Sequence, residues 1–309
     1  MRNLHIVVAT IGRPTCRSVV HDALLRERRL ARLTIVAQGG AHILDLDLRE
    51  LANREGVAIA EVMLPERVGP DRARHVGTAQ GTEEFVGFLD DDIGFDSGSL
   101  SSLVERCERE TVGAACGVLS VPETGFAASL LKAILFRSIF RDPRPLATRV
   151  RRRMRTNFLS GGMAVYRRDL YARSAPAWLD LGSDAWWGDA YVSYEASRHA
   201  TLAVDPAARV RNRTREVSTG PPNATARALW RLDRYRTFAH LHASTRRHWA
   251  AYGGVLVCVL GRGVVEGACP EFLRAVLGEV VHTARQVGLR PAVQPRPSGL
   301  EHPAPSQRV

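Results

Sequence analysis

Short apolar runs alternate with amphipathic stretches along the first 120 residues of the chain. The apolar runs predict strands at residues 5–10, 33–37, 57–64 and 85–89. Between and after them, apolar residues recur at helical spacing and predict helices at residues 14–30, 44–54, 71–81 and 99–110. Continuously apolar strands separated by helices are typical of a mostly parallel sheet with helices on both faces. We therefore expect a Rossmann-like α/β fold, whose ligands bind beyond the carboxyl ends of the strands.

The rest of the chain divides into parts of different composition. An apolar stretch at helical spacing is followed by prolines and an arginine run, a second α/β portion comes next, and Arg-, Trp- and His-rich helices follow. The last nineteen residues hold five prolines and little apolar content, which predicts a disordered tail. The predicted parts are the first half of the α/β domain at 1–120, a basic amphipathic insertion at 121–156, the second half of the domain at 157–210, a helical region at 211–290 and the tail at 291–309.

The positive charge of the chain is concentrated in two segments. The net charge is +11 over 309 residues, and Lys132 is the one lysine among 43 basic residues. Residues 137–155 carry eight arginines against one acid, and residues 209–247 carry ten against two. Residues 130–155 pair an apolar stripe with an arginine cluster, and residues 225–252 repeat that pattern with interspersed Trp and Tyr. These two stretches could bring the protein to an anionic membrane surface, or they could be solvated basic faces over packed helices.

Cysteine usage and the apolar stretches indicate the compartment. Five cysteines, an odd number without a C-x-x-C pair, argue against a disulfide framework and against a zinc site. The N-terminus shows no signal-peptide pattern, and the longest apolar stretch, 249–260, is too short to span a bilayer. We expect a cytoplasmic protein, with peripheral contact at the inner face of the membrane as one option.

Three consecutive carboxylates, Asp90, Asp91 and Asp92, end the strand predicted at 85–89. Adjacent carboxylates repel one another, and a bound cation offsets that cost. All-oxygen ligands suit Mg²⁺ or Mn²⁺ better than zinc. The alternative is a solvated turn in which one aspartate caps the next helix.

Five short segments of the chain share an order that is known from one protein family. They are the strand that ends in Thr10-Ile11-Gly12-Arg13-Pro14, the 67–81 segment with Arg74 and Gly77, the Asp90–Asp92 motif, the Gly161-Gly162 pair, and Gly188-Asp189 before a helix. Together they resemble the family 2 glycosyltransferases of the GT-A fold. The resemblance covers roughly residues 3 to 210. It implies a GT-A sheet in which 1–120 binds a nucleotide sugar and 157–210 carries the acceptor and catalytic half.

The resemblance also implies roles for single residues. Asp90 and Asp92 would bind the metal that bridges the donor diphosphate, with Asp92 the more direct ligand, and Asp91 would take the variable middle position of the donor-binding motif. Thr10 and Arg13 would lie near the nucleoside, Arg74 would face the nucleotide, and Asp189 would be the catalytic base.

Five candidate site residues keep a second interpretation. Asp189 could instead cap the helix that follows it. Gly161 and Gly162 could let the backbone approach the donor sugar, or they could form a plain turn. Trp186 and Trp187 could offer a platform for the acceptor, or they could be ordinary core residues.

The chain departs from the family pattern at several positions. Residues 36–40 read Val-Ala-Gln-Gly-Gly, without the aspartate that contacts the nucleobase in the family. His75 replaces an asparagine, Gly188 replaces a glutamate, and Glu195 stands where arginine is common. The Q-x-x-R-W element of processive synthases is absent, which favours a single transfer over polymerisation.

The predicted activity is a metal-dependent, inverting transfer of a hexosyl or deoxyhexosyl group from a nucleoside-diphosphate sugar to an acceptor hydroxyl. The acceptor could belong to a cell-envelope glycan, a lipid-linked intermediate or a secondary metabolite. A nucleic-acid-binding protein is the alternative from another class, but it leaves the acidic motif unexplained, so no nucleic-acid partner is predicted. A sugar nucleotidyltransferase would be expected to show a Gly-rich phosphate loop with a lysine near the N-terminus, which this chain does not show.

Overall fold

The computed structural model describes residues 2–109, 112–120, 152–175, 188–213, 272–278 and 280–281, and the single residues 253, 256 and 260. The strands are β1 (Leu4–Thr10), β2 (Leu30–Gln38), β3 (Ala58–Leu64), β4 (Phe85–Asp90), β5 (Ile93–Phe95), β6 (Val112–Ser120), β7 (Met154–Thr156), β8 (Met163–Arg167) and β9 (Thr201–Asn212). The helices with given bounds are α1 (Thr15–Arg26), α2 (Leu46–Arg54), α3 (Pro70–Thr78), α4 (Ser99–Arg109), α6 (Arg168–Ser174) and α8 (Gly188–His199).

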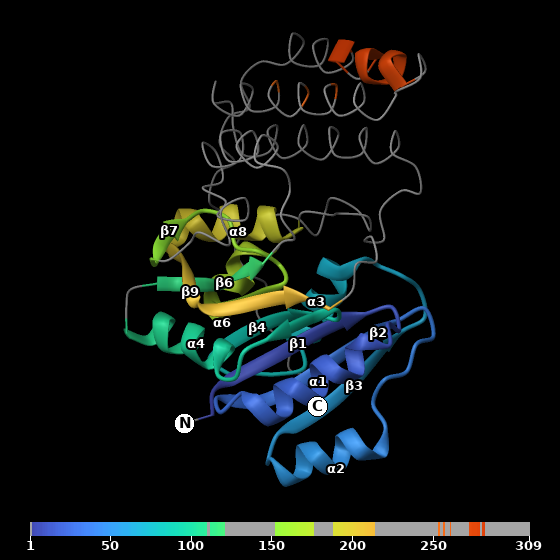
Figure 1. Cartoon of the computed structure of the whole chain (residues 1–309), viewed down its shortest axis with the longest axis vertical. Coiled ribbons are helices and arrows are strands. Elements are labelled where there is room, and N and C mark those ends of the chain that lie inside the picture. The colour runs from blue at the N-terminus through green and yellow to red at the C-terminus, as the bar shows by residue number, and fades with distance from the viewer. Residues whose placement is uncertain are drawn as a thin grey trace, which may run out of the picture.

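These strands form one sheet in the order β3-β2-β1-β4-β8-β6-β9-β5, with β7 paired to β9 (Figure 1). Six strands run in one direction, namely β1, β2, β3, β4, β6 and β9, and the other three run against them. The predicted α/β class with a mostly parallel sheet is therefore confirmed. The antiparallel strand β8 stands between β4 and β6, so the residues that precede β8 lie at the carboxyl end of β4.

Apolar side chains cover both faces of the sheet and form two cores. In β1, Ile6 and Val8 belong to the core under α1, α2 and α4, whereas Val7 belongs to the core under α3, α6 and α8. Successive side chains of a strand point to opposite faces of the sheet. A strand is apolar throughout when helices bury both of those faces, as they do here. The helical layers on the two sides are visible in Figure 1.

The first helix is shorter than its periodicity predicts, and a buried carboxylate accounts for the difference. Helix α1 ends at Arg26, and Glu27 takes an extended backbone, so β2 begins at Leu30 rather than at residue 33. The Glu27 carboxylate accepts hydrogen bonds from the backbone N–H groups of Leu100 at 3.1 Å and Ser101 at 2.9 Å. It thereby satisfies two of the open N–H groups at the start of α4.

Helix α3 lies unusually close to the sheet. A Cβ atom added at Gly77 would stand 2.4 Å from Cγ1 of Val7 and 2.9 Å from Cγ2 of Val36, so only glycine fits there. Gly69 precedes the helix at φ +84°, a backbone conformation that favours glycine, and Pro70 occupies the first turn. This close approach brings Arg74 to the carboxyl end of β4.

Several predicted parts lie outside the described residues, namely the insertion up to residue 151, Trp186 and Trp187, most of the helical region, and the tail at 291–309. Strand β7 falls within the last residues of the predicted insertion and joins the sheet through β9. Phe272 and Val276, from a short described helical piece, are buried in the same core as α6 and α8. Among the described residues, no helix combines the length and apolar character needed to cross a bilayer.

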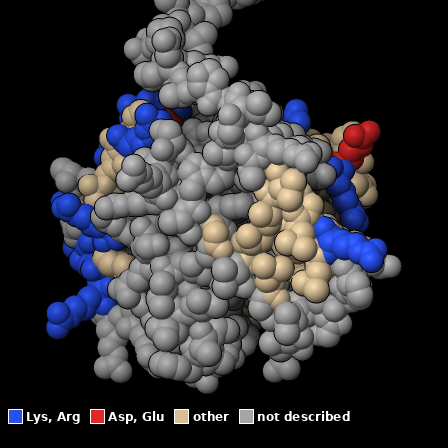
Figure 2. Space-filling view, turned by 90° about the horizontal axis from the view of Figure 1, so that it is seen from above, with Lys and Arg blue, Asp and Glu red and all other residues tan. Residues whose placement is uncertain are grey.

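Basic side chains are prominent on the face of the molecule that Figure 2 shows. Seen from above, basic side chains are far more evident than acidic ones among the residues drawn in colour (Figure 2). Many of these arginines have acidic partners: Arg153 pairs with Asp205 at 3.2 Å, and Arg211 pairs with Asp96 at 3.1 Å. The predicted membrane-facing stretches at 130–155 and 225–252 fall mostly outside the described residues.

A buried histidine joins three elements at the amino end of the sheet. His5 on β1 is fully buried, and its Nε2 lies 2.8 Å from Oγ1 of Thr34 on β2. Arg168 at the start of α6 donates to Nδ1 over 3.0 Å. Because Nδ1 accepts this bond, the ring is neutral and Nε2 carries the proton. Burial lowers the pKa of His5 to about 4, partly opposed by the Glu83 carboxylate.

We predict that His5 makes the fold sensitive to mild acid. The unfolded chain binds a proton at His5 below about pH 6.5, whereas the folded protein resists it down to about pH 4, so stability is lost as the pH falls through that window. The difference is worth about 3 kcal/mol at most. In urea titrations at a series of pH values, His5→Gln should lose less stability on acidification than the wild type. His21→Gln, a change on the exposed side of α1, is the control and should follow the wild type; if His5→Gln also did so, the neutral buried ring would be the wrong explanation.

Candidate active site

The three consecutive aspartates at the end of β4 face different surroundings. Asp91 turns inward, where it accepts a hydrogen bond from Oγ1 of Thr10 at 2.7 Å and one from Arg13 at 3.0 Å. Burial raises the pKa of the Asp91 carboxyl, and the hydrogen bond from Thr10 opposes that shift. The Thr10 Oγ1 atom also accepts from the backbone N–H of Gly12 at 3.0 Å. Asp91 thus ties the end of β1 to the end of β4, and its observed partners are protein groups.

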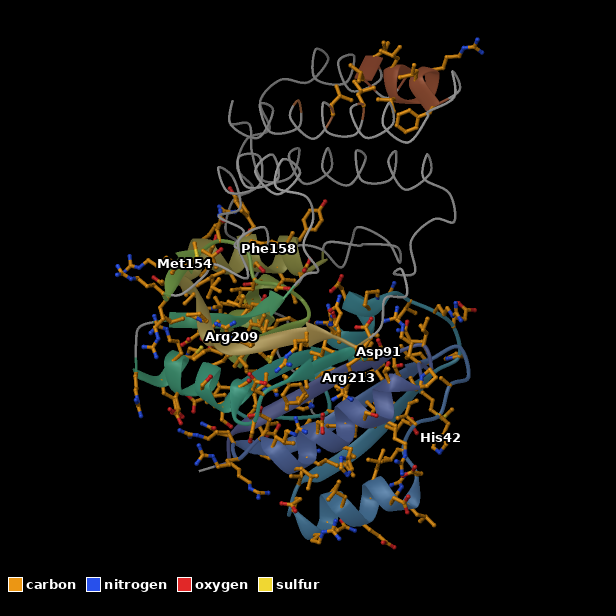
Figure 3. All side chains as sticks on the ribbon, viewed as in Figure 1. His42, Asp91, Met154, Phe158, Arg209 and Arg213 are labelled. Carbon is orange, nitrogen blue, oxygen red and sulfur yellow. The ribbon has the colours of Figure 1, made fainter. Side chains whose placement is uncertain are left out.

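Asp92 lies beside the same arginine. The Arg13 Nη1 atom donates to Oδ2 of Asp92 at 2.7 Å, and the Asp92 side chain is 17% exposed. Its backbone carbonyl accepts from the N–H of Arg213 at 2.7 Å, which fixes the turn after β4 against the end of β9. Figure 3 labels Asp91 and Arg213 on this side of the sheet.

Arg74 is buried, and its guanidinium group lies between the carboxylates of Asp71 and Asp90. One guanidinium nitrogen bonds Oδ1 of Asp71 at 2.8 Å, and the other bonds the Asp90 carboxylate and the Gly161 carbonyl, the latter at 3.2 Å. Burial alone would lower the pKa of Arg74, but the carboxylates of Asp90 and Asp71 raise it, so the side chain stays charged. A buried charge is tolerated only when it is paired in this way.

Asp189 lies in the first turn of α8, and Gly161 stands between it and Arg74. Its Oδ2 accepts from the backbone N–H of Gly161 at 3.0 Å, and its Oδ1 accepts from the N–H of Ala190 at 2.8 Å. A Cβ at Gly161 would stand 3.1 Å from Nη1 of Arg74 and 3.2 Å from Oδ2 of Asp189. Glycine at this position therefore lets the arginine and the aspartate approach one loop from two sides.

The carboxylate chemistry of Asp90 and Asp92 and the room beside Asp90 fit a hard divalent cation. The Asp90 side chain is 38% exposed, and a Cβ at Gly162 would lie 3.4 Å from its Oδ2, so glycine leaves room beside that oxygen. In the parts of the chain that the structure describes, no cluster of three or more His, Cys, Asp and Glu side chains is arranged to hold a metal by itself. Two carboxylates that share an ion with substrate phosphates are a common arrangement for Mg²⁺.

The end of β2 has no aspartate in the place where the resemblance expects one to contact the nucleobase. Gln38 is buried, and its Oε1 accepts from the backbone N–H of Val68 at 2.9 Å, so its side chain is engaged with the loop before α3. Gly39 and Gly40 follow with φ values of +67° and +80°. Both glycines are exposed, and the backbone N–H of Gly39 donates to the Leu64 carbonyl at 2.9 Å.

Two residues of this site were not singled out from the sequence. Asp71 is buried between Arg74 and the start of α8, and its position three residues before Arg74 on a helix was a usable signal for an ion pair. Ser193 carried no sequence signal that marked it as a site residue. Its Oγ accepts from the N–H of Leu159 at 3.0 Å and donates to the Asp189 carbonyl.

Glu195, which stands where the family pattern commonly has an arginine, pairs with Arg198 at 3.2 Å and His199 at 3.4 Å on its own helix.

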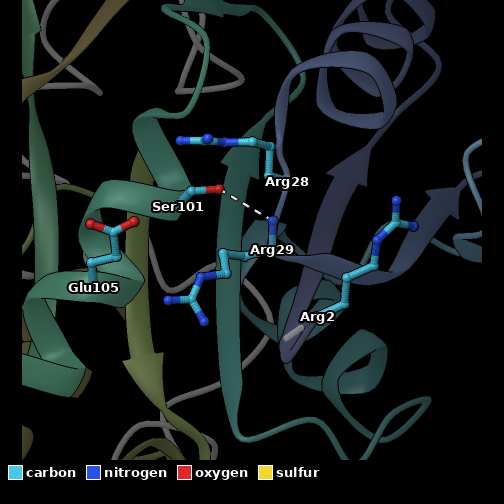
Figure 4. A pocket seen from close by; sticks show the side chains of 5 residues that line it. All are labelled: Arg2, Arg28, Arg29, Ser101 and Glu105. Carbon is cyan, nitrogen blue, oxygen red and sulfur yellow. Dashed lines mark hydrogen bonds between the residues drawn. The ribbon is translucent and has the colours of Figure 1, made fainter.

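A hollow lies at the opposite end of the sheet from the aspartates. It has a volume of about 390 Å³ and is lined by Arg2, Arg28, Arg29, Ser101 and Glu105 (Figure 4). Arg29 already forms a two-point ion pair with Glu108, at 3.1 and 2.8 Å. Because the hollow opens at the amino ends of β1 and β2, it is remote from the aspartates.

Solved structures share this architecture. A mannosyltransferase from Pyrobaculum calidifontis, solved with GDP-Man and Mn²⁺, has a TM-score of 0.51 at 15% identity, over 93% of this chain and 81% of that chain. Residues 1–349 of S. aureus TarS, solved with UDP-GlcNAc, have a TM-score of 0.59 at 15% identity, over 92% and 81%. At this identity the likeness establishes the fold. A search of curated protein sequences finds no significant match.

A family model matches the chain as well. Residues 47–174 match the model described as glycosyl transferase family 2. The matched stretch contains Arg74, the three aspartates and the Gly161-Gly162 loop, and it ends before Asp189. The match covers less than half of the chain, and together with the solved structures it supports the expected GT-A fold.

Proposed function

We propose that this protein is a metal-dependent, inverting glycosyltransferase that moves a hexosyl or deoxyhexosyl group from a nucleoside-diphosphate sugar to an acceptor hydroxyl. One observation carries the proposal: Arg74 and Gly161 connect the Asp90 carboxylate to the Asp189 carboxylate at the carboxyl end of the sheet. Such an edge is where open α/β sheets bind their ligands. The solved relatives that contain GDP-Man or UDP-GlcNAc support the same donor class.

Asp90 and Asp92 would hold the Mg²⁺ or Mn²⁺ ion in this proposal. When bound, that ion supplies positive charge that stabilises the departing diphosphate. Arg74 keeps the Asp90 carboxylate in one orientation, and Arg13 does the same for Asp92. Thr10 and Asp91 hold the ends of β1 and β4 together, so both metal-binding carboxylates start from a fixed backbone.

Asp189 would accept the proton of the attacking hydroxyl. A general base must reach the acceptor from the side opposite the leaving group, and direct displacement from that side inverts the anomeric centre. Asp189 suits this role because it stands on α8, an element separate from the strand that carries Asp90 and Asp92. The Gly161 and Ala190 N–H groups fix the carboxylate in place.

The first test concerns metal-dependent donor binding. Wild-type protein with UDP or GDP and Mn²⁺ should gain about 2.7 kcal/mol of stability at a ligand concentration 100 times Kd. Asp92→Ala should remove this gain in thermal-shift measurements while the protein stays folded. The matched control is Asp96→Ala, because Asp96 lies four residues away, is 52% exposed and pairs with Arg211. Equal metal-dependent shifts in all three proteins would rule out Asp92 as a ligand.

The second test separates a base from a helix cap at Asp189. Asn has a similar size and caps a helix well, so a capping role predicts little change for Asp189→Asn. A base role predicts that kcat for transfer falls by about 10² or more while donor affinity stays nearly unchanged. Asp169→Asn is the control, since Asp169 occupies the first turn of α6 and is 68% exposed. Transfer at the wild-type rate by Asp189→Asn would remove this residue from the mechanism.

A further inference from the structure

Asp71 is a buried carboxylate between two parts of the site. It stands in the first turn of α3 and is 8% exposed. Its Oδ1 accepts from Arg74 at 2.8 Å, and its Oδ2 accepts from the backbone N–H of Gly188 at 3.1 Å. The Asp71 side chain thus joins Arg74 to the start of α8, the helix that carries Asp189.

Gly188 is the position that makes this contact possible. A Cβ atom at residue 188 would stand 2.4 Å from both Cγ and Oδ2 of Asp71, and 2.6 Å from its Cβ. No real side chain fits at such distances, so the Asp71 carboxylate occupies the space that a side chain at 188 would enter. The family pattern has a glutamate at this position, whereas here the acidic group arrives from α3.

We propose that Asp71 replaces the missing acidic side chain of position 188 and acts as the positioning residue that couples Asp189 to Arg74. This inference rests on the proposed function for its catalytic consequence, although the coupling itself is a property of the folded protein. The two oxygens of one carboxylate serve two donors, the guanidinium and the first turn of α8. A displacement of either donor therefore moves the other.

The position of Asp71 also suits the charges around it. The N-terminal end of a helix carries partial positive charge and is stabilised by a nearby anion. Asp71 lies against that end of α8, while Arg74 lies between the carboxylates of Asp71 and Asp90. Arg74 has further bonds to Asp90 and Gly161, so loss of Asp71 should affect α8 more than the donor side.

The experiment compares Asp71 with a carboxylate of matched structural role. Glu27 is also buried and also bonds backbone N–H groups at a helix start, but on the other face of the sheet. Asp71→Ala should lower kcat for transfer about 10-fold or more, with a smaller change in donor Kd, as removal of a supporting group usually does. Glu27→Ala should keep kcat per folded molecule within about twofold of the wild type. Equal kcat losses in the two variants, or wild-type kcat in Asp71→Ala, would overturn the proposal.

Three further variants keep the result interpretable if Asp71→Ala folds poorly. Asp71→Asn retains an acceptor for the Gly188 N–H but loses the charge that faces Arg74, so its kcat should fall between those of the alanine variant and the wild type. The exchange Asp71→Gly with Gly188→Asp returns a carboxylate to the same space from the opposite backbone. This double variant should recover part of the kcat lost in Asp71→Gly alone. If kcat did not recover, the proposal that Asp71 replaces an acidic side chain at position 188 would be wrong.

Hydrogen exchange separates this inference from the proposed function. The amides of residues 188–193 should exchange faster in Asp71→Ala than in the wild type and should be unchanged in Glu27→Ala. This readout needs no donor, acceptor or activity. If the wild type transfers no sugar but the amides respond as described, the proposed function fails and the coupling stands. If the amides do not respond, the coupling fails whatever the activity.

Discussion

A single buried guanidinium, that of Arg74, sets the geometry on which the rest of the site depends. A charge removed from water must be paired at close range, and here the partners come from separate elements: Asp71 from α3 and Asp90 from β4. The Gly161 carbonyl completes the set. Because these groups must converge on one side chain, the helix, the strand end and the loop before β8 are fixed together. The carboxylates of the site are therefore held in place before any ligand arrives.

Glycine makes this convergence sterically possible. Gly77 lets α3 approach β1 and β2, Gly161 lets Arg74 and Asp189 share one loop, and Gly188 leaves the space that the Asp71 carboxylate fills. Each is a place where a Cβ would stand closer than about 3.2 Å to another atom. Glycine loses more backbone entropy on folding than other residues do. The chain bears this cost at three positions, all of which serve the cluster around Arg74.

The sequence predicts the fold better than it predicts the site's connections. Uninterrupted apolar runs identified β1 and β4 almost to the residue, because strands buried on both faces have few polar positions to interrupt the pattern. The edge strand β3 was also predicted to within one residue, although none of its residues is fully buried. The end of α1 was misplaced because a carboxylate from Glu27 stops the helix through a contact with α4, which no local pattern records. The resemblance supplied Asp90, Asp92, Arg74 and Asp189, and the structure brings Asp90, Arg74 and Asp189 into one network. The pairing of Asp71 with Gly188 spans 117 positions of the chain and was invisible from sequence.

The antiparallel insertion of β8 between β4 and β6 has a consequence for folding. Gly162 bonds the backbone N–H of Asp90 through its carbonyl at 3.1 Å, so the loop and the strand end are adjacent only after β8 has entered the middle of the sheet. Contacts between segments this far apart in sequence form late, because closing the intervening chain costs entropy before any contact rewards it. A half-assembled sheet that contains only β1 to β4 would hold the three aspartates without the loop that faces them. Under the proposed function, donor binding depends on the completed sheet, and chains stalled before that step would be unable to bind a donor.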